Sequence, residues 1–85
     1  SEPLVDVFED GVSVVVLAEL IGIDQESIDL HATEDRLAIS VDSAERKYDR
    51  QIELPAKVDV GSSFSCLKHG ILEVRLRKLE EKLVF

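Results

Sequence analysis

The stretch Phe-Ser-Cys-Leu-Lys-His-Gly-Ile-Leu-Glu-Val-Arg-Leu-Arg, residues 64–77, carries the pattern that decides the fold. Apolar and polar residues alternate on both sides of Gly70, and such period-two alternation is typical of strands with one buried face. Phe64 and Cys66 share a face of the first half. The second half places three apolar residues on one face, namely Leu72, Val74 and Leu76. Glycine adopts positive φ at low cost, so Gly70 predicts a tight turn. The stretch is therefore a predicted β-hairpin whose buried face needs a second sheet to cover it.

The rest of the chain shows the same pattern of short apolar segments separated by turn residues. Further strands are predicted at residues 4–9, 12–20, 28–32, 36–42 and 46–54. Segment 12–20 is almost continuously apolar, which favours a strand covered on both faces; a helix is the rival interpretation, but three consecutive valines disfavour it. Pro55 ends the last segment because it has no N–H to donate. Residues 24–27 are predicted to hold one helical turn, and residues 56–63 a surface loop. The predicted fold is all-β, an immunoglobulin-like antiparallel β-sandwich of about seven strands.

Composition narrows the classes of function. The chain has 85 residues and is 45% hydrophobic without Trp or Met, so one domain with a core of Val, Leu and Ile is expected. Its net charge of −8 argues against nucleic acid and anionic membranes as partners. No apolar run is long enough to cross a bilayer. The single cysteine makes no internal disulfide, which favours a cytoplasmic protein.

Four segments in order, residues 14–23, 28–39, 45–55 and 65–72, make the chain similar to the α-crystallin domain of small heat-shock proteins. The third contains Arg46-Lys47-Tyr48-Asp49-Arg50-Gln51-Ile52-Glu53-Leu54-Pro55, like the family's Arg-x-Phe/Tyr-x-Arg-x-Ile/Phe-x-Leu-Pro segment. The fourth matches its Ala-x-x-x-x-Gly-Val-Leu motif, with Ser65 in place of alanine; Ile21 stands where proline is usual. The connection from Asp42 to Arg46 is too short for the extra strand that many members exchange between subunits. A monomer, or a weak dimer through an exposed strand edge, is therefore expected.

The resemblance implies a non-enzymatic, ATP-independent chaperone, a holdase that binds unfolding proteins and slows their aggregation. It also implies an apolar groove for client segments and extended apolar tails, between the strands that match residues 28–32 and 63–68. The family's groove positions correspond to Ile28, Leu30, Phe64 and Cys66, and each has the parity expected to face between the two sheets. Ordinary core residues are the alternative interpretation of these four. Residues 78–85 are a candidate C-terminal tail, in which Leu83 and Phe85 resemble the family's Ile-x-Ile motif. The alternative function is a protein–protein interaction module, or a co-chaperone-like domain of the related CS type, within a larger protein.

No constellation for catalysis, metal or cofactor is found in the sequence. His31 and His69 lie on different predicted segments, without a neighbouring Cys or His at ligand spacing. Both are expected at the surface or in turns. Cys66 is expected to be a small buried apolar residue, because nothing near it in sequence would lower its pKa.

Overall fold

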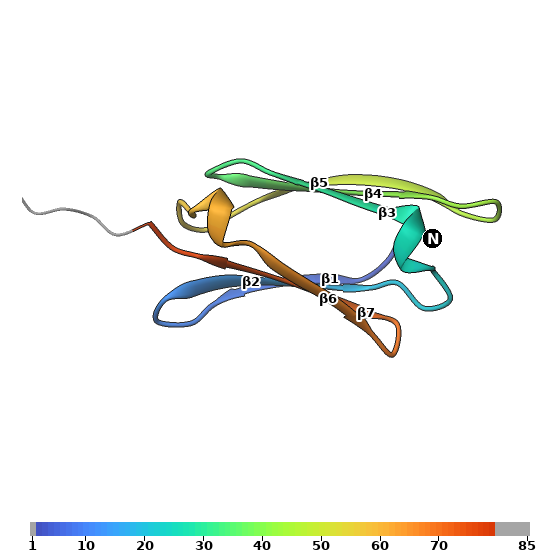
Figure 1. Ribbon diagram of the computed structural model, residues 1–85, viewed down its shortest axis with the longest axis horizontal. Coiled ribbons are helices and arrows are strands. Elements are labelled where there is room, and N and C mark those ends of the chain that lie inside the picture. The colour runs from blue at the N-terminus through green and yellow to red at the C-terminus, as the bar shows by residue number, and fades with distance from the viewer. Residues whose placement is uncertain (1, 80–85) are drawn as a thin grey trace, which may run out of the picture.

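Seven antiparallel strands form two facing sheets in the computed structural model, which describes residues 2–79 (Figure 1). One sheet has four strands, in the order β1 (Val5–Glu9), β2 (Ser13–Glu19), β7 (Ile71–Arg77) and β6 (Phe64–Lys68). The other has three, in the order β3 (Ile28–Ala32), β4 (Arg36–Asp42) and β5 (Lys47–Glu53). Two single turns of 3-10 helix, η1 (Gln25–Ser27) and η2 (Val60–Ser62), precede β3 and β6. The predicted β-sandwich and the helical turn within residues 24–27 are confirmed.

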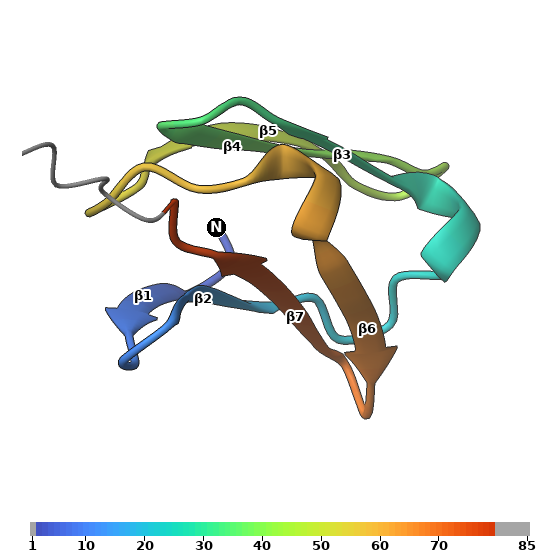
Figure 2. The same ribbon diagram turned by 60° about the vertical axis from the view of Figure 1, so that its left-hand side comes forward.

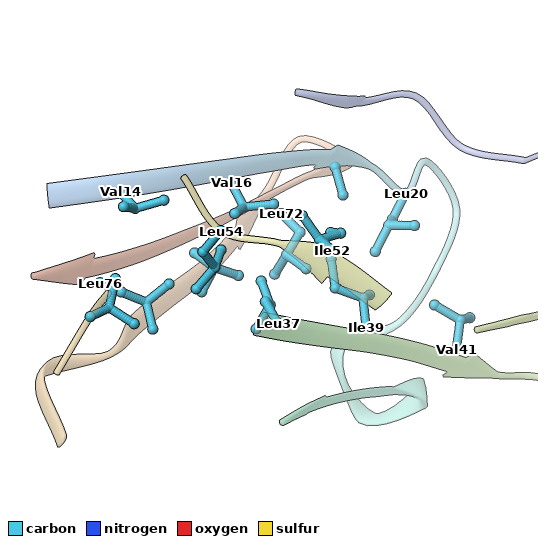
Figure 3. Close-up of a cluster of buried hydrophobic side chains, with 13 residues drawn as sticks. Val14, Val16, Leu20, Leu37, Ile39, Val41, Ile52, Leu54, Leu72 and Leu76 are labelled. Atoms are coloured by element: carbon cyan, nitrogen blue, oxygen red, sulfur yellow. The ribbon is translucent and has the colours of Figure 1, made fainter. Parts of the chain in front are cut away.

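The core lies between the sheets and is built from branched aliphatic side chains (Figure 3). Register fixes which residues enter it: Val14, Val16 and Ala18 of β2 lie opposite Leu76, Val74 and Leu72 of β7. On the facing sheet β4 contributes its own alternate residues, Leu37, Ile39 and Val41. All of these side chains are at most 3% exposed, which confirms the predicted buried face of β7.

Strand β2 is buried on its inner face and, as its continuous apolarity predicted, partly covered on its outer face, where Val15 is buried and Leu17 is half-buried. Val15 points away from the core, yet it is only 1% exposed. It lies directly between Phe8 of β1 and Arg75 of β7, whose longer side chains flank it on the outer face. Cross-strand neighbours on one face of a sheet are close enough to contact each other, and these two cover Val15.

Residues 56–63 were predicted to form a surface loop, and this prediction is wrong at Val58. Val58 is fully buried and forms an isolated antiparallel bridge with Lys78. The N–H groups of Lys78 and Leu79 donate to the carbonyls of Val12 and Lys57. The candidate tail therefore starts against the body of the domain, and its remaining residues, 80–85, lie outside the described part of the chain.

The β6–β7 turn requires glycine. His69 and Gly70 both have positive φ, 52° and 77°, as a two-residue type I′ turn demands. The Gly70 carbonyl also accepts a hydrogen bond from the Leu20 N–H at 2.7 Å, which brings the turn against Ile21. A Cβ at position 70 would lie 2.8 Å from Cγ1 and 3.0 Å from Cα of Ile21. Backbone strain and steric crowding thus coincide there.

Gly70→Ala should lower the free energy of unfolding by about 1–3 kcal/mol, because alanine is strained at positive φ and its Cβ meets Ile21. Two glycines separate the causes. Gly22 has φ 78°, but a Cβ at this position would meet no atom within 4 Å, so Gly22→Ala measures only the cost of the backbone strain. Gly11 has neither a positive φ nor a close neighbour. Denaturant unfolding should rank the losses 70 > 22 > 11. Equal stability of the Gly70 and Gly11 variants would contradict this account of the turn.

The β1–β2 turn is held by a charged side chain. Asp10 Oδ1 accepts hydrogen bonds from the N–H groups of Val12 at 3.0 Å and Ser13 at 2.6 Å, and Oδ2 receives Arg75 Nη1 at 2.9 Å. The two backbone hydrogen bonds, followed by the Arg75 contacts, hold the pKa of Asp10 below the ordinary 3.8 of an aspartate. The folded state therefore favours the ionised carboxylate.

This linkage gives a signed pH dependence. The stability contributed by Asp10 is fully present above about pH 4 and is lost as the pH falls through its lowered pKa. Asp10→Asn should therefore be less stable than the parent at neutral pH, and the two should converge in acid. Thermal unfolding between pH 2.5 and 7 tests this expectation, and a constant difference across that range would rule it out.

Candidate functional site: a groove between two strand edges

The two sheets leave a groove open along one side of the sandwich. Strand β3 is an edge of the three-stranded sheet and β6 is an edge of the four-stranded sheet, so each has one side without a strand partner. Both border the same side of the molecule (Figure 2). We call the space between them the β3/β6 groove.

Two adjoining hollows make up this groove. The larger, of about 350 Å³, reaches the core at Leu37, Val74 and Leu76. The smaller, of about 140 Å³, is bordered by Gln25, Ile28, Leu67 and Leu72. Leu30 and Ser65 line both hollows, which makes the groove continuous along the two strands. The groove therefore has the elongated form that suits an extended segment better than a compact ligand.

Ile28 and Leu30 lie where they were predicted. Both are half-buried, pack against the core and alternate with the exposed Asp29 and His31. Register places Leu30 opposite the fully buried Ile39, so its side chain faces inward at the groove. The inward direction of these two side chains agrees with the alternation in the sequence, and their role in binding stays a prediction.

The prediction for β6 had the wrong face. Phe64 and Cys66 lie opposite Arg75 and Glu73, on the outer side of the sheet, and both are exposed. The inward residues are Ser65 and Leu67. Phe64 does line the larger hollow from the end of the strand, but Cys66 does not, and the prediction of a buried Cys66 is also wrong.

The physical reason lies in the turn. A two-residue loop at 69–70 puts Lys68 opposite Ile71 and Leu67 opposite Leu72. Because Leu72 faces the core, Leu67 and Ser65 must face it too, whatever their hydrophobicity. Counting back across the turn from Leu72 would have found these two residues in the sequence. Val60 of η2 and Gln25 of η1 also line the groove, and no sequence pattern pointed to them.

The groove lining has few ionisable side chains. Among the described residues it contains no aspartate, glutamate, lysine or arginine, although the chain is one-third charged. Within residues 2–79, the only ionisable side chain in this lining is that of His31, whose position in the alternation of β3 puts it on the exposed face of the strand. A charge inserted there would lose water without gaining an oppositely charged partner among these side chains.

The remaining candidate residues do not assemble into a site. Within residues 2–79, no three His, Cys, Asp or Glu side chains are placed to hold a metal ion. His31 lies on β3, whereas His69 lies in the β6–β7 turn of the other sheet. Leu83 and Phe85 lie outside the described residues. No helix in the described part of the chain has the length and apolarity of a membrane span.

The connection between β4 and β5 is a tight hairpin. The Ser43 N–H donates to the Arg46 carbonyl at 2.9 Å, and the Arg46 N–H donates to Ser43 Oγ at 3.0 Å. Strands β4 and β5 pair directly on either side, from Asp42 opposite Lys47 to Arg36 opposite Glu53. No strand lies between them, in agreement with the short connection seen in the sequence, and β5 is left as an edge.

Comparison with known proteins places this fold. The model of the Hsp20/alpha crystallin family matches residues 6–83. Heat shock protein 16.0 from Schizosaccharomyces pombe is 27% identical, with a TM-score of 0.84 over 100% of this chain and 94% of that one. HspA from Xanthomonas axonopodis is 26% identical, with a TM-score of 0.78 over 92% and 94% of the two chains. The rat alpha crystallin domain, at 18% identity, shares the fold with a TM-score of 0.69 over 96% of each chain.

No curated protein sequence gives a significant match. The family model nevertheless spans all seven strands except the first residue of β1, and both sides of the β3/β6 groove lie within it. The family consists of non-enzymatic chaperones, and this membership confirms the prediction that the chain is not an enzyme. On the strength of that match, the chain is a member of the Hsp20/alpha crystallin family of small heat-shock proteins.

Proposed function

We propose that this chain is an ATP-independent holdase that captures apolar segments of unfolding proteins in the β3/β6 groove and slows their aggregation. One observation supports this above all others: a groove whose described lining is mostly apolar and has no lysine, arginine or carboxylate side chain lies between two strand edges that lack partners. A segment entering it gains backbone hydrogen bonds from an edge and buries alternate side chains against Leu30 and Leu67. This is peptide recognition by strand addition.

The affinity for any one segment should be low. The groove offers a few half-buried side chains, and their contribution must offset the ordering of a flexible peptide. Weak, sequence-tolerant binding suits a holdase, because unfolding proteins expose many different apolar segments. The expected partners are therefore unfolded or partly folded clients and extended apolar tails, in a cytoplasmic setting.

An aggregation assay tests this function. A thermally unfolding enzyme is heated with increasing amounts of the full chain, without ATP, and light scattering is recorded. We expect scattering to fall as the chain is added, and an equal mass of an inert soluble protein should have no effect. Undiminished scattering for several unrelated clients at molar excess would contradict the proposal.

A protein–protein interaction module is the second candidate, including a co-chaperone-like domain of the CS type. The direct β4–β5 hairpin favours it, because it leaves no exchanged strand through which to build the assemblies of many family members. The same assay separates the two candidates. A holdase protects unrelated clients, whereas a dedicated module binds one folded partner and protects none.

A further inference from the structure

Large apolar side chains gather on the outer face of the four-stranded sheet, the side that points away from the core. Phe8 of β1 is 43% exposed, Phe64 of β6 is 58% exposed and Ile71 of β7 is 40% exposed. Leu4, just before β1, is 76% exposed and shares a hollow of about 360 Å³ with Leu17 and Ile71. In contrast, none of the exposed large apolar residues of the described chain lies on β3, β4 or β5. This face, which we call the outer apolar face, therefore differs from the three-stranded sheet, and the other exposed large apolar residues, Val12, Ile21, Val60 and Leu79, lie in the connections between strands or after β7.

Register arranges this face in rows across the strands. Phe8, Val15, Arg75 and Phe64 form one row through β1, β2, β7 and β6. The two phenylalanines thus mark opposite edges of the sheet at the same height. Both are outside the core, so neither exposure is explained by packing within the domain.

Charge on this face is balanced, although the chain carries a net charge of −8. Its strands present three acids, Asp6, Glu19 and Glu73, and three bases, Lys68, Arg75 and Arg77. Arg75 is occupied by Glu73 at 3.2 Å and by Asp10 of the neighbouring turn at 2.9 Å. With Arg75 and Glu73 paired, two acidic and two basic side chains of this face are left outside these ion pairs.

The four remaining charges are separated by sign. Asp6 and Glu19 lie on β1 and β2, whereas Lys68 and Arg77 lie on β6 and β7. None of the four forms an ion pair with another residue in the 2–79 range. One half of the face is thus acidic, the other half is basic, and the apolar side chains are spread across both.

Such a surface is complementary to itself. A two-fold axis that runs along the strands, midway between β2 and β7, lays the β1–β2 half of one copy over the β7–β6 half of another. The closed interface then uses the same patch on both copies, with the two sheets about 10 Å apart. Phe8 comes to lie over Phe64 of the partner subunit, and Glu19 comes within reach of Lys68 of the partner subunit.

We propose that two copies of this chain associate face to face through the outer apolar face, with the acidic half of each against the basic half of the other. This inference does not rest on the holdase function, and Phe64 is the one described residue that lines the β3/β6 groove and also belongs to the outer apolar face. It replaces pairing through a strand edge, which the short β4–β5 connection suggested, as the expected mode of self-association.

Charge exchange between two variants tests the proposal. Sedimentation velocity of the full chain over a wide concentration range should show a monomer–dimer equilibrium. Glu19→Lys and Lys68→Glu each bring like charges together in both symmetry-related contacts between positions 19 and 68. Each substitution should therefore weaken the dimer at least about tenfold. An equimolar mixture of the two variants should form a heterodimer of nearly parental affinity, because both contacts then join opposite charges.

Asp29→Lys is the matched control, because it makes the same kind of charge reversal on the exposed face of β3, in the other sheet. It should leave the dimer unchanged, and circular dichroism should show that all variants remain folded. A parental chain that stays monomeric at every concentration overturns the proposal. So does a dimer that ignores the Glu19 and Lys68 substitutions, or a mixture that fails to recover association.

Discussion

Leu72→Ala should lower the free energy of unfolding by about 2–5 kcal/mol. Leu72 is 3% exposed and lies between Ala18 and Leu67, on the face of β7 that meets the second sheet. Truncation removes apolar contacts from both sheets and leaves a cavity that the rigid strands fill poorly. A domain of this size is stabilised by only about 5–15 kcal/mol in total, so this one change removes a large share. Chemical denaturation followed by circular dichroism gives the value.

Ile71→Ala is the natural control for this measurement. Ile71 is the preceding residue, has the same number of side-chain carbons and points to the opposite face, where it is 40% exposed. Its truncation should cost about 1 kcal/mol or less when measured on the monomer. Similar losses for the two variants would mean that the faces of β7 are assigned wrongly.

Leu30→Glu should abolish peptide binding in the β3/β6 groove while the domain stays folded. Leu30 lines both hollows of the groove and is half-buried, so the new carboxylate can turn toward water in the free protein. A bound apolar segment would cover this charge and strip it of water without offering a partner. We expect affinity to fall more than about tenfold, measured by titration with a short Leu-x-Phe or Ile-x-Ile peptide.

Ala38→Glu places the same carboxylate on the outer face of the same sheet, on the neighbouring strand β4. It should bind peptide as the parental chain does. If Leu30→Glu instead unfolds, Leu30 belongs to the core and the groove is closed at that point. If both variants bind as well as the parental chain, the peptide lies elsewhere.

The strands were predictable because one face of each meets the core. In β7 and β4 the inward residues are all large and aliphatic, whereas the alternate positions are mostly charged, polar or small, and this contrast favours one face. Strand β6 lacks that contrast: Phe-Ser-Cys-Leu-Lys has apolar residues at both parities. The face was set instead by the two-residue turn after it, which is a constraint of register and not of composition.

Other features depend on contacts that no local pattern records. Val58 and Val60 are both valines of the same short loop, yet only Val58 is buried, at the point where the loop forms a bridge with Lys78, twenty positions later. The groove itself exists because β3 and β6 happen to be edges on the same side of the sandwich. Alternation identified Ile28 and Leu30 as inward-facing, but only the strand order shows that they border an opening.

The central claim is that the β3/β6 groove takes an extended apolar segment as an added strand. Its most direct test is a titration of the isotopically labelled full chain with a Leu-x-Phe peptide, followed by amide NMR shifts. The account predicts progressive shifts at Leu30, Ser65 and Leu67, which line the groove, and none at Ser40 or Asp49 on the outer face of the three-stranded sheet. Unchanged groove resonances at millimolar peptide would contradict it.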